Sequence, residues 1–267
     1  YIPYKKLMKN KKPEWVIDKE RVRKTAEKHS FWLFGIHAVR DALENPNREK
    51  IKLLITKNAQ NKLENSIKLT EIETKIIEPK AFNELLDKNS VHQGVALEVK
   101  PLKWGSLSEN INKKKANSIV LLLDRISDPH NVGAILRSAE VFGIEAVIGT
   151  KRHSAPETGA LAKAASGALE RQPYLRIRNL SEGIDELKQL GFVVLGLDGL
   201  ANISLNKGVN SFPAGPIAFV LGAEGPGLRD KTKSHCDMLV KIPSHNSEGS
   251  LNVSNAAAVA MYDLRFC

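Results

Sequence analysis

Three segments in the second half of the chain place glycine, asparagine and small polar residues directly after short apolar runs. They surround Asn131, Gly222 and Asn252. In open α/β sheets ligands bind outside the carboxyl ends of the strands, so three such strand ends predict one shared site. Glycine lets backbone amides approach a ligand closely, and Asn and Ser side chains can bond to ribose hydroxyls. The chemistry indicated is the binding of a nucleoside-like ligand.

Each segment also has a purely structural explanation. The glycines from 222 to 227 are as compatible with a tight turn as with a ligand-binding loop. Asn252 and its neighbouring serines are typical of a helix N-cap before the apolar run 256 to 261. The chain lacks the dinucleotide and phosphate-loop motifs, HExxH, GxSxG and clustered Cys and His. Metal catalysis is therefore disfavoured, and histidines such as His130 are best explained as turn or surface residues.

Strands that alternate with helices would position the three segments. From residue 118 onward, apolar runs of strand length occur with helical candidates between most of them. This alternation predicts an α/β fold in which helices cover both faces of a parallel sheet. The expected strands are 119 to 123, 146 to 149, 192 to 197, 217 to 221 and 238 to 242.

The helix after the first of these strands is the best defined. Arg137 lies opposite its apolar stripe, and Gly143 is placed to end it. Alanine-rich stretches at 160 to 168 and 256 to 260 predict two further helices that pack closely against neighbours. The apolar stripe consists of Val132, Ile135, Leu136, Ala139 and Phe142.

A small mixed α/β domain is expected over residues 31 to 100. The segment 101 to 117 is polar and rich in lysine, without apolar periodicity, and is expected to be a linker. The small domain should contain an apolar segment turning into a helix at 31 to 43, strands at 51 to 56, 74 to 77 and 95 to 99, and helices at 62 to 69 and 79 to 86.

The charge of the chain favours a polyanionic partner. Its 267 residues carry a net charge of +10, and residues 1 to 30 hold ten Lys or Arg against four Asp or Glu. This basic N-terminal arm also contains Tyr1, Tyr4 and Trp15, so it is either an RNA contact or a solvated tail. The two cysteines suggest no disulfide framework, and no apolar run could span a bilayer. A cytoplasmic protein without membrane contact is expected.

In order and combination, the three segments resemble the motifs of the SpoU family of RNA 2′-O-ribose methyltransferases, also called the TrmH family. Phe34 to Val39 (FGIHAV) and His92 to Gly94 (HQG) are similar to the substrate-binding domain of the subgroup that modifies large-subunit ribosomal RNA. The three methyltransferase motifs correspond to Asp128 to Ala139 (DPHNVGAILRSA), Leu221 to Leu228 (LGAEGPGL), and Ile242-Pro243 with Ser250 to Ser254 (SLNVS).

The resemblance implies a parallel-sheet methyltransferase domain over residues 118 to 267 with a trefoil knot, one of the rare exceptions to unknotted chains. It implies methyl transfer from S-adenosylmethionine to the 2′-hydroxyl of a guanosine ribose in 23S rRNA, at an active site completed across a homodimer. The residues that match the family's functional positions are Asn131, Arg137, Glu224, Ser250 and Asn252. The expected cofactor-binding residues are Leu195, Gly196, Gly222, Ala223, Ile242 and Leu251.

The resemblance leaves two roles for Arg137, a base that deprotonates the ribose hydroxyl or a ligand of the RNA, and we favour the second. A guanidinium stays protonated near neutral pH and donates hydrogen bonds to phosphates, so we expect Arg137 to bind the target phosphate or ribose and to acidify the hydroxyl. Three alternatives remain: a transfer RNA substrate, a non-catalytic RNA-binding or ribosome-assembly factor, and a general α/β nucleotide-binding enzyme. The retention of Asn131, Glu224 and Asn252 beside Arg137 argues against the assembly factor.

Overall fold

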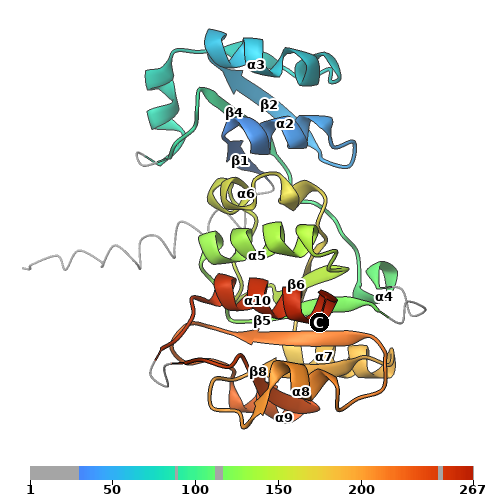
Figure 1. Ribbon diagram of the computed structural model, residues 1–267. Coiled ribbons are helices and arrows are strands. Elements are labelled where there is room, and N and C mark those ends of the chain that lie inside the picture. Colours follow the sequence, from blue (N-terminus) through green and yellow to red (C-terminus); the bar gives the residue numbers. More distant parts are fainter. Residues whose placement is uncertain (1–29, 88–89, 112–116, 246–248, 267) are drawn as a thin grey trace, which may run out of the picture.

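The computed structural model describes residues 30–87, 90–111, 117–245 and 249–266. The basic N-terminal arm up to residue 29 and the lysine run at 113–115 lie outside the described residues. The described chain contains a four-stranded sheet and a seven-stranded sheet (Figure 1). None of the described helices is long and apolar enough to cross a membrane.

The four-stranded sheet has the order β1-β4-β2-β3, in which β4 is antiparallel to both neighbours and β3 is parallel to β2. Helices α2 and α3 pack on one face, and a 3₁₀ helix, η1, packs on the other through Phe82. Helix α3 begins five residues before its predicted start because Thr56 caps it. The elements are β1 (Phe31–Phe34), α2 (Ile36–Glu44), β2 (Lys50–Ile55), α3 (Lys57–Lys68), β3 (Thr74–Ile76), η1 (Pro79–Glu84) and β4 (Val95–Val99).

All pairings in the seven-stranded sheet are parallel, which confirms the predicted α/β fold. Its order is β7-β6-β5-β10-β8-β11-β9. The five predicted strands are present, whereas β7 and β9 are not among those expected from the sequence. The strands are β5 (Ile119–Asp124), β6 (Ala146–Thr150), β7 (Tyr174–Ile177), β8 (Val193–Leu197), β9 (Ile203–Ser204), β10 (Ile217–Gly222) and β11 (Met238–Lys241).

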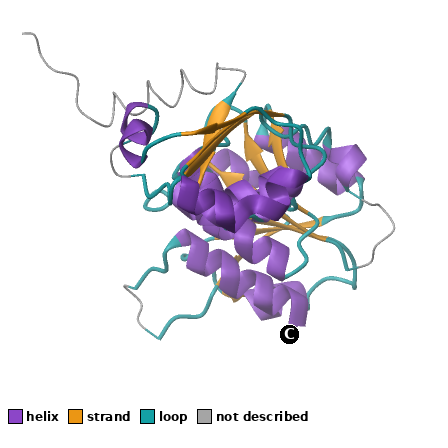
Figure 2. Cartoon of the chain, turned by 90° about the horizontal axis from the view of Figure 1, so that it is seen from above, coloured by secondary structure: helices purple, strands orange, loops and turns teal. Residues whose placement is uncertain are grey.

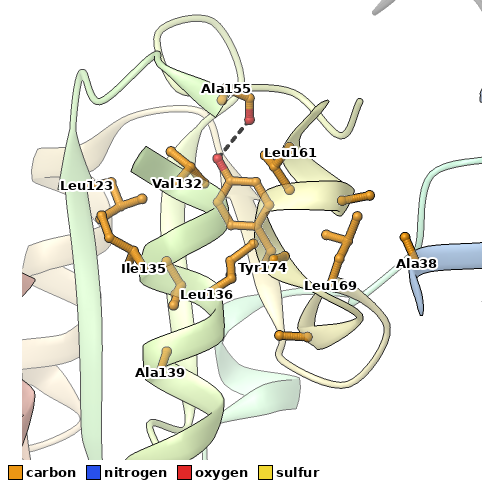
Figure 3. Packing of buried hydrophobic residues seen from close by; sticks show 14 of the residues in the cluster. Ala38, Leu123, Val132, Ile135, Leu136, Ala139, Ala155, Leu161, Leu169 and Tyr174 are labelled. Atoms are coloured by element: carbon orange, nitrogen blue, oxygen red, sulfur yellow. Dashed lines mark hydrogen bonds between the residues drawn. The ribbon is translucent and has the colours of Figure 1, made fainter. Parts of the chain in front are cut away.

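Helices cover both faces of this sheet (Figure 2). Alternate residues of β5 enter two different cores, because successive side chains of a strand point to opposite faces. One core holds α5, α6, α8 and α10, and the stripe of α5 packs around the ring of Tyr174 there (Figure 3). The other core holds α4 and α7. The helices are α4 (Leu107–Asn110), α5 (Pro129–Val141), α6 (Gly159–Ala165), η2 (Ala168–Glu170), α7 (Leu180–Gln189), α8 (Leu205–Val209), α9 (Asp230–His235) and α10 (Val253–Phe266).

Helices α5 and α6 approach each other at backbone distance. A Cβ atom on Gly133 would lie 2.5 Å from the Ala164 Cβ and 2.7 Å from the Leu161 carbonyl oxygen. At the other end of α5, Arg265 of α10 donates hydrogen bonds to the carbonyl oxygens of Phe142 (2.9 Å) and Gly143 (2.6 Å). These contacts fix α5 between its two neighbouring helices.

The segment 101 to 117 contains regular structure, contrary to the linker prediction. Helix α4 begins after Ser106, whose backbone N–H donates to Glu109 Oε2 at 2.7 Å in a capping box. Leu107 and Ile111 are buried in the same core as α7. This part of the segment is therefore packed onto the larger sheet.

A buried ion network joins the small domain to the larger one. The Arg48 side chain is fully buried and contacts Glu170 at 2.7 Å and Glu157 at 2.9 Å. It also donates to the Lys100 carbonyl oxygen at 2.8 Å. Beside this network α6 packs against β1, where a Cβ on Gly159 would lie 2.5 Å from the Trp32 carbonyl oxygen (Figure 1). The two domains therefore share one tightly packed interface.

Candidate active site

The three segments singled out in the sequence meet at the carboxyl edge of the seven-stranded sheet. They follow β5, β10 and β11, and β8 lies between β10 and β11. Because all these strands are parallel, their carboxyl ends lie on the same edge. The fold therefore places residues that are more than 120 positions apart in one region.

Asn131, Glu224 and Asn252 form a closed hydrogen-bonded group, here called the Asn-Glu-Asn cluster. Glu224 Oε1 accepts from Asn252 Nδ2 at 2.6 Å, from Asn131 Nδ2 at 3.3 Å and from the Val253 backbone N–H at 3.2 Å. Asn252 Nδ2 also lies 3.0 Å from Asn131 Oδ1. Hydrogen bonds to an ionised acceptor are stronger than neutral ones, so the carboxylate organises both amides.

Helix caps explain how the two asparagines are held. Helix α5 begins with Pro129 after Asp128, whose side chain accepts the His130 N–H at 3.0 Å, and this places Asn131 in the first turn. Asn252 precedes α10, and its Oδ1 accepts the Ser254 N–H at 2.9 Å. Asn252 thus caps a helix with its oxygen and contributes to the cluster with its nitrogen. The cap expected from the sequence is therefore present, and the remaining hydrogen bond of the side chain goes to protein groups.

The glycines after β10 build a tight turn that presents Glu224. A Cβ on Gly222 would lie 2.2 Å from the Gly227 carbonyl carbon, so only glycine allows the loop to fold back on the strand end. Gly225 and Gly227 have φ values of 83° and 67°, and the Gly227 N–H donates to the Ala223 carbonyl oxygen at 2.9 Å. The glycine pattern is thus required by the turn itself.

The residues expected to bind the cofactor lie near the ends of three adjacent strands. Gly196 is in β8, Gly222 and Ala223 are at the end of β10, and Ile242 directly follows β11. Leu195 is buried within β8, with strand partners on both sides, whereas the Leu251 side chain is 52% exposed.

Two glycines near this edge of the sheet face open space. A Cβ on Gly199, just beyond β8, or on Gly225 would meet nothing within 4 Å. Ile242, which directly follows β11, is half-buried, and Leu251 is exposed.

Two predicted site residues are not joined to the cluster. Arg137 is exposed on α5, and Ser250 is exposed ahead of α10. Neither side chain forms a hydrogen bond or an ion pair with any residue that the structure describes. Within one chain, therefore, both side chains are free to contact a ligand or a second protein.

Asp124 and Arg229 support the site but are not singled out by the sequence motifs. Asp124 is 1% exposed and accepts hydrogen bonds from the Arg229 backbone N–H (3.1 Å) and Nε (2.8 Å). This pair ties the loop carrying Glu224 to the end of β5. A carboxylate at the end of an otherwise apolar strand was the available signal, because a buried acid needs a charged partner.

Comparisons with known proteins agree with this geometry. The SpoU rRNA Methylase family model matches residues 118–262, and a model described as RNA 2′-O ribose methyltransferase substrate binding matches residues 32–105. The chain belongs to the SpoU rRNA methylase family. Members of this family are RNA methyltransferases, so the chain is an enzyme of that class.

Related proteins match most of the chain. The 23S rRNA (guanosine-2′-O-)-methyltransferase RlmB of Pseudomonas putida is 36% identical over 237 residues, covering 86% of this chain and 94% of that protein. RlmB of Coxiella burnetii is 35% identical over 240 residues, covering 87% and 94%. The match therefore includes both the small and the large domain.

Solved structures share the fold. The SpoU methyltransferase AviRb from Streptomyces viridochromogenes, in complex with the cofactor AdoMet, has a TM-score of 0.77 at 24% identity, covering 91% of each chain. An AdoMet-bound rRNA methyltransferase from Sinorhizobium meliloti has a TM-score of 0.76 at 19% identity, covering 91% of this chain and 89% of that chain. Both domains of the present chain thus have a counterpart of known structure.

Proposed function

We propose that this protein transfers a methyl group from S-adenosylmethionine to the 2′-hydroxyl of a guanosine ribose in 23S rRNA. The observation that carries the proposal is the Asn-Glu-Asn cluster, in which all three family motifs meet within hydrogen-bonding distance. The similarity to RlmB proteins over both domains supports the choice of substrate. Residues 31 to 100 would form the RNA substrate-binding domain, and residues 118 to 267 the methyltransferase domain.

S-Adenosylmethionine would supply an electrophilic methyl group, held at the ends of β10, β8 and β11. In this proposal the backbone groups of Leu195, Gly196, Gly222 and Ala223 bind the cofactor, together with Ile242 and Leu251. Such binding needs no metal, and it fixes the reacting groups in line, which supplies much of the rate of a displacement.

The polar side chains would act on the RNA ribose. Asn131 and Asn252, held by Glu224, would orient the ribose, and Ser250 would add a hydroxyl beside them. Arg137 would bind the phosphate or ribose of the target and lower the pKa of the attacking hydroxyl through its fixed positive charge.

We propose further that the active site is completed in a homodimer. An exposed apolar surface runs over the end of α5 and along α10, including Val141 (74% exposed), Tyr262 (54%) and Phe266 (64%). Exposed aromatic and aliphatic side chains gathered in one patch are typical of protein interfaces. Arg137 precedes Val141 by one helical turn on the same face of α5. A partner subunit that covers Val141 would therefore also contact Arg137, and in this proposal Arg137 reaches the active site of that subunit.

We also propose that the protein is located in the cytoplasm and that its methyltransferase domain contains a trefoil knot. Ribosomal RNA as substrate supports a cytoplasmic location. The position of β10 between β5 and β8, and the return of α10 from β11 to pack on α5, support a C-terminal segment that threads through an earlier loop.

The proposal is tested by methyl incorporation into defined RNAs. Purified protein is incubated with labelled S-adenosylmethionine and unmodified 23S rRNA or transfer RNA, and the position of any 2′-O-methyl group is mapped. We expect one guanosine of 23S rRNA to be labelled at similar initial rates by the natural chain and by the control variant Glu186→Ala, and about a hundredfold more slowly by Glu224→Ala. Labelling of transfer RNA alone would support the transfer RNA alternative, and labelling of neither would support the assembly factor.

A further inference from the structure

A basic pocket of about 670 Å³ opens at the carboxyl ends of β5, β6 and β7. It lies on the same sheet edge as the Asn-Glu-Asn cluster, on the side away from β8 and β11. Glu182 is the one acidic residue among the described residues that line it. The basic side chains in the lining are Arg125, Lys151, Arg152, His153, Arg178 and Arg229.

Most of these cations lack a protein counter-ion. Arg125, Lys151, Arg152 and Arg178 form no ion pair within the described parts of the chain. Arg229 is paired with Asp124, and Glu182 accepts a hydrogen bond from Asn179 at 3.0 Å. Like charges collected around a cavity repel one another and concentrate anions from solution. Glu182 alone cannot neutralise these positive charges. The pocket is therefore electrostatically suited to an anionic ligand.

The loop that carries three of the basic residues is held rigidly from β7. Arg176 donates from Nη2 to the carbonyl oxygens of Thr150 (2.9 Å), Lys151 (3.1 Å) and Ser154 (3.0 Å). The Tyr174 hydroxyl donates to the Ala155 carbonyl oxygen at 2.8 Å (Figure 3). A loop fixed in this way loses little freedom when a ligand binds.

The lining residues indicate which anion fits. The volume is that of a pocket for a whole small ligand and exceeds the space that a single ion needs. Among the described lining residues His153 is the one aromatic side chain, and no Phe, Tyr or Trp offers a larger surface on which a base could stack. Guanidinium groups match phosphate oxygens by donating two parallel hydrogen bonds. These features favour the sugar-phosphate backbone of a nucleic acid over a base.

The position of the pocket relates it to the proposed reaction. Glu224 and Arg229 lie on the same loop between β10 and α9, and Arg229 bonds to Asp124 at the end of β5. Arg125 follows Asp124 directly, on the turn that leads to Asn131. A strand with its phosphates in the pocket would therefore run along the sheet edge toward the cluster.

We propose that the basic pocket binds backbone phosphates of the RNA strand next to the target nucleotide. It contributes affinity and places the strand, and it does not choose the base, because contacts to phosphate carry no sequence information. The inference rests on the proposed function only in taking RNA as the substrate.

The test neutralises two unpaired cations of the pocket. RNA binding is measured by fluorescence anisotropy over a series of KCl concentrations, with a 23S rRNA fragment and the double variant Arg152→Ala/Arg178→Ala. The single variants and Lys207→Ala, an exposed lysine on α8, provide the matched comparison. Each phosphate contact that is lost should lower the slope of log affinity against log salt concentration by about 0.7 to 0.9. Affinity for S-adenosylmethionine, the unfolding temperature and the mapped nucleotide should stay as in the natural chain.

Three results would overturn the inference: an RNA salt slope of the double variant equal to that of Lys207→Ala, a weakened affinity for S-adenosylmethionine alone, or a methyl group moved to another nucleotide. The same measurements distinguish failure of the pocket assignment from failure of the proposed function. If the natural chain methylates 23S rRNA while the double variant binds RNA as Lys207→Ala does, only the pocket assignment fails. If the natural chain methylates no RNA but the salt slope still falls in the double variant, the phosphate site stands and the proposed function fails.

Discussion

The replacement of Arg48 by methionine should be among the most destabilising single substitutions in this protein. Methionine has a similar length but no charge, so it leaves Glu157 and Glu170 buried without their cation. The two carboxylate side chains are only 7% and 3% exposed. Removal of one partner from a buried ion pair costs about 3–5 kcal/mol, because the remaining charge is neither solvated nor paired.

Thermal and urea unfolding would measure this loss. At roughly 2–4 °C per kcal/mol for a chain of this size class, the unfolding temperature should fall by about 6–20 °C. Arg40→Met is the matched control, since the Arg40 side chain is 44% exposed and its ion pair with Asp41 should be worth at most about 1 kcal/mol. If Arg48→Met lowers the unfolding temperature no more than Arg40→Met does, the buried ion network does not stabilise the contact between the two domains.

The pH dependence provides a second check. Burial raises the pKa of Glu157 above its ordinary value, although Arg48 opposes this effect. A carboxyl whose pKa is higher in the folded than in the unfolded state binds its proton more tightly on folding, so acidification through that pKa favours the folded state. Without Arg48 the pKa should rise further. The stability deficit of Arg48→Met should therefore shrink as the pH falls from about 8 to about 5, and a constant deficit would contradict this account.

Three further predictions concern the large domain. Burial raises the pKa of the Cys236 thiol to about 11. In the Cys267→Ser variant, iodoacetamide should therefore alkylate Cys236 at least about tenfold more slowly in the folded state than in the urea-unfolded state. Equal rates would argue against a buried thiol. Gly133→Ala places a Cβ 2.5 Å from that of Ala164 and should cost about 1–3 kcal/mol in urea unfolding, whereas an unchanged midpoint would show that α5 and α6 can separate freely. Glu224→Ala should lower the initial rate of methyl transfer about a hundredfold while RNA affinity stays within about twofold, because both asparagines lose their anchor; a normal rate would remove the cluster from the reaction.

The apolar runs were sufficient to predict the centre of the large sheet. Strands such as β5 and β10 are buried on both faces, so they consist almost entirely of aliphatic residues and stand out in the sequence. Strand β7 lies at the edge of the sheet, and its short Tyr-Leu-Arg-Ile sequence has no such run. The order of the strands could not be derived, because it depends on contacts between distant segments.

Local signals were present at two positions where the predictions fell short. The pattern Ser106-x-x-Glu109 is a capping box, and it would have located α4 within the expected linker. The basic residues Arg125, Lys151 and Arg178 each follow the carboxyl end of a strand, a position where ligands bind. Their convergence on one pocket required knowing that β5, β6 and β7 are neighbours.

The site itself was predicted from motif order, and its hydrogen bonds were not. The sequence identified Asn131, Glu224 and Asn252 as separate members of three motifs, and each had an alternative explanation as a cap or turn. Only the structure shows that Glu224 binds both amides. The exposure of Arg137 was predicted from its place opposite the apolar stripe of α5, whereas its separation from the cluster required the structure.

The double use of Asn252 has a consequence for how the enzyme is made. Its amide group both starts α10 and holds Glu224 and Asn131, so the proposed site cannot assemble until the last helix has formed and docked. During synthesis the small domain and most of the large sheet emerge before α10, and they can begin to order while α10 is still being synthesised. None of the described residues that line the basic pocket belongs to α10, so the pocket and the cluster differ in their dependence on this helix. In the proposed function, activity is thereby linked to the docking of α10.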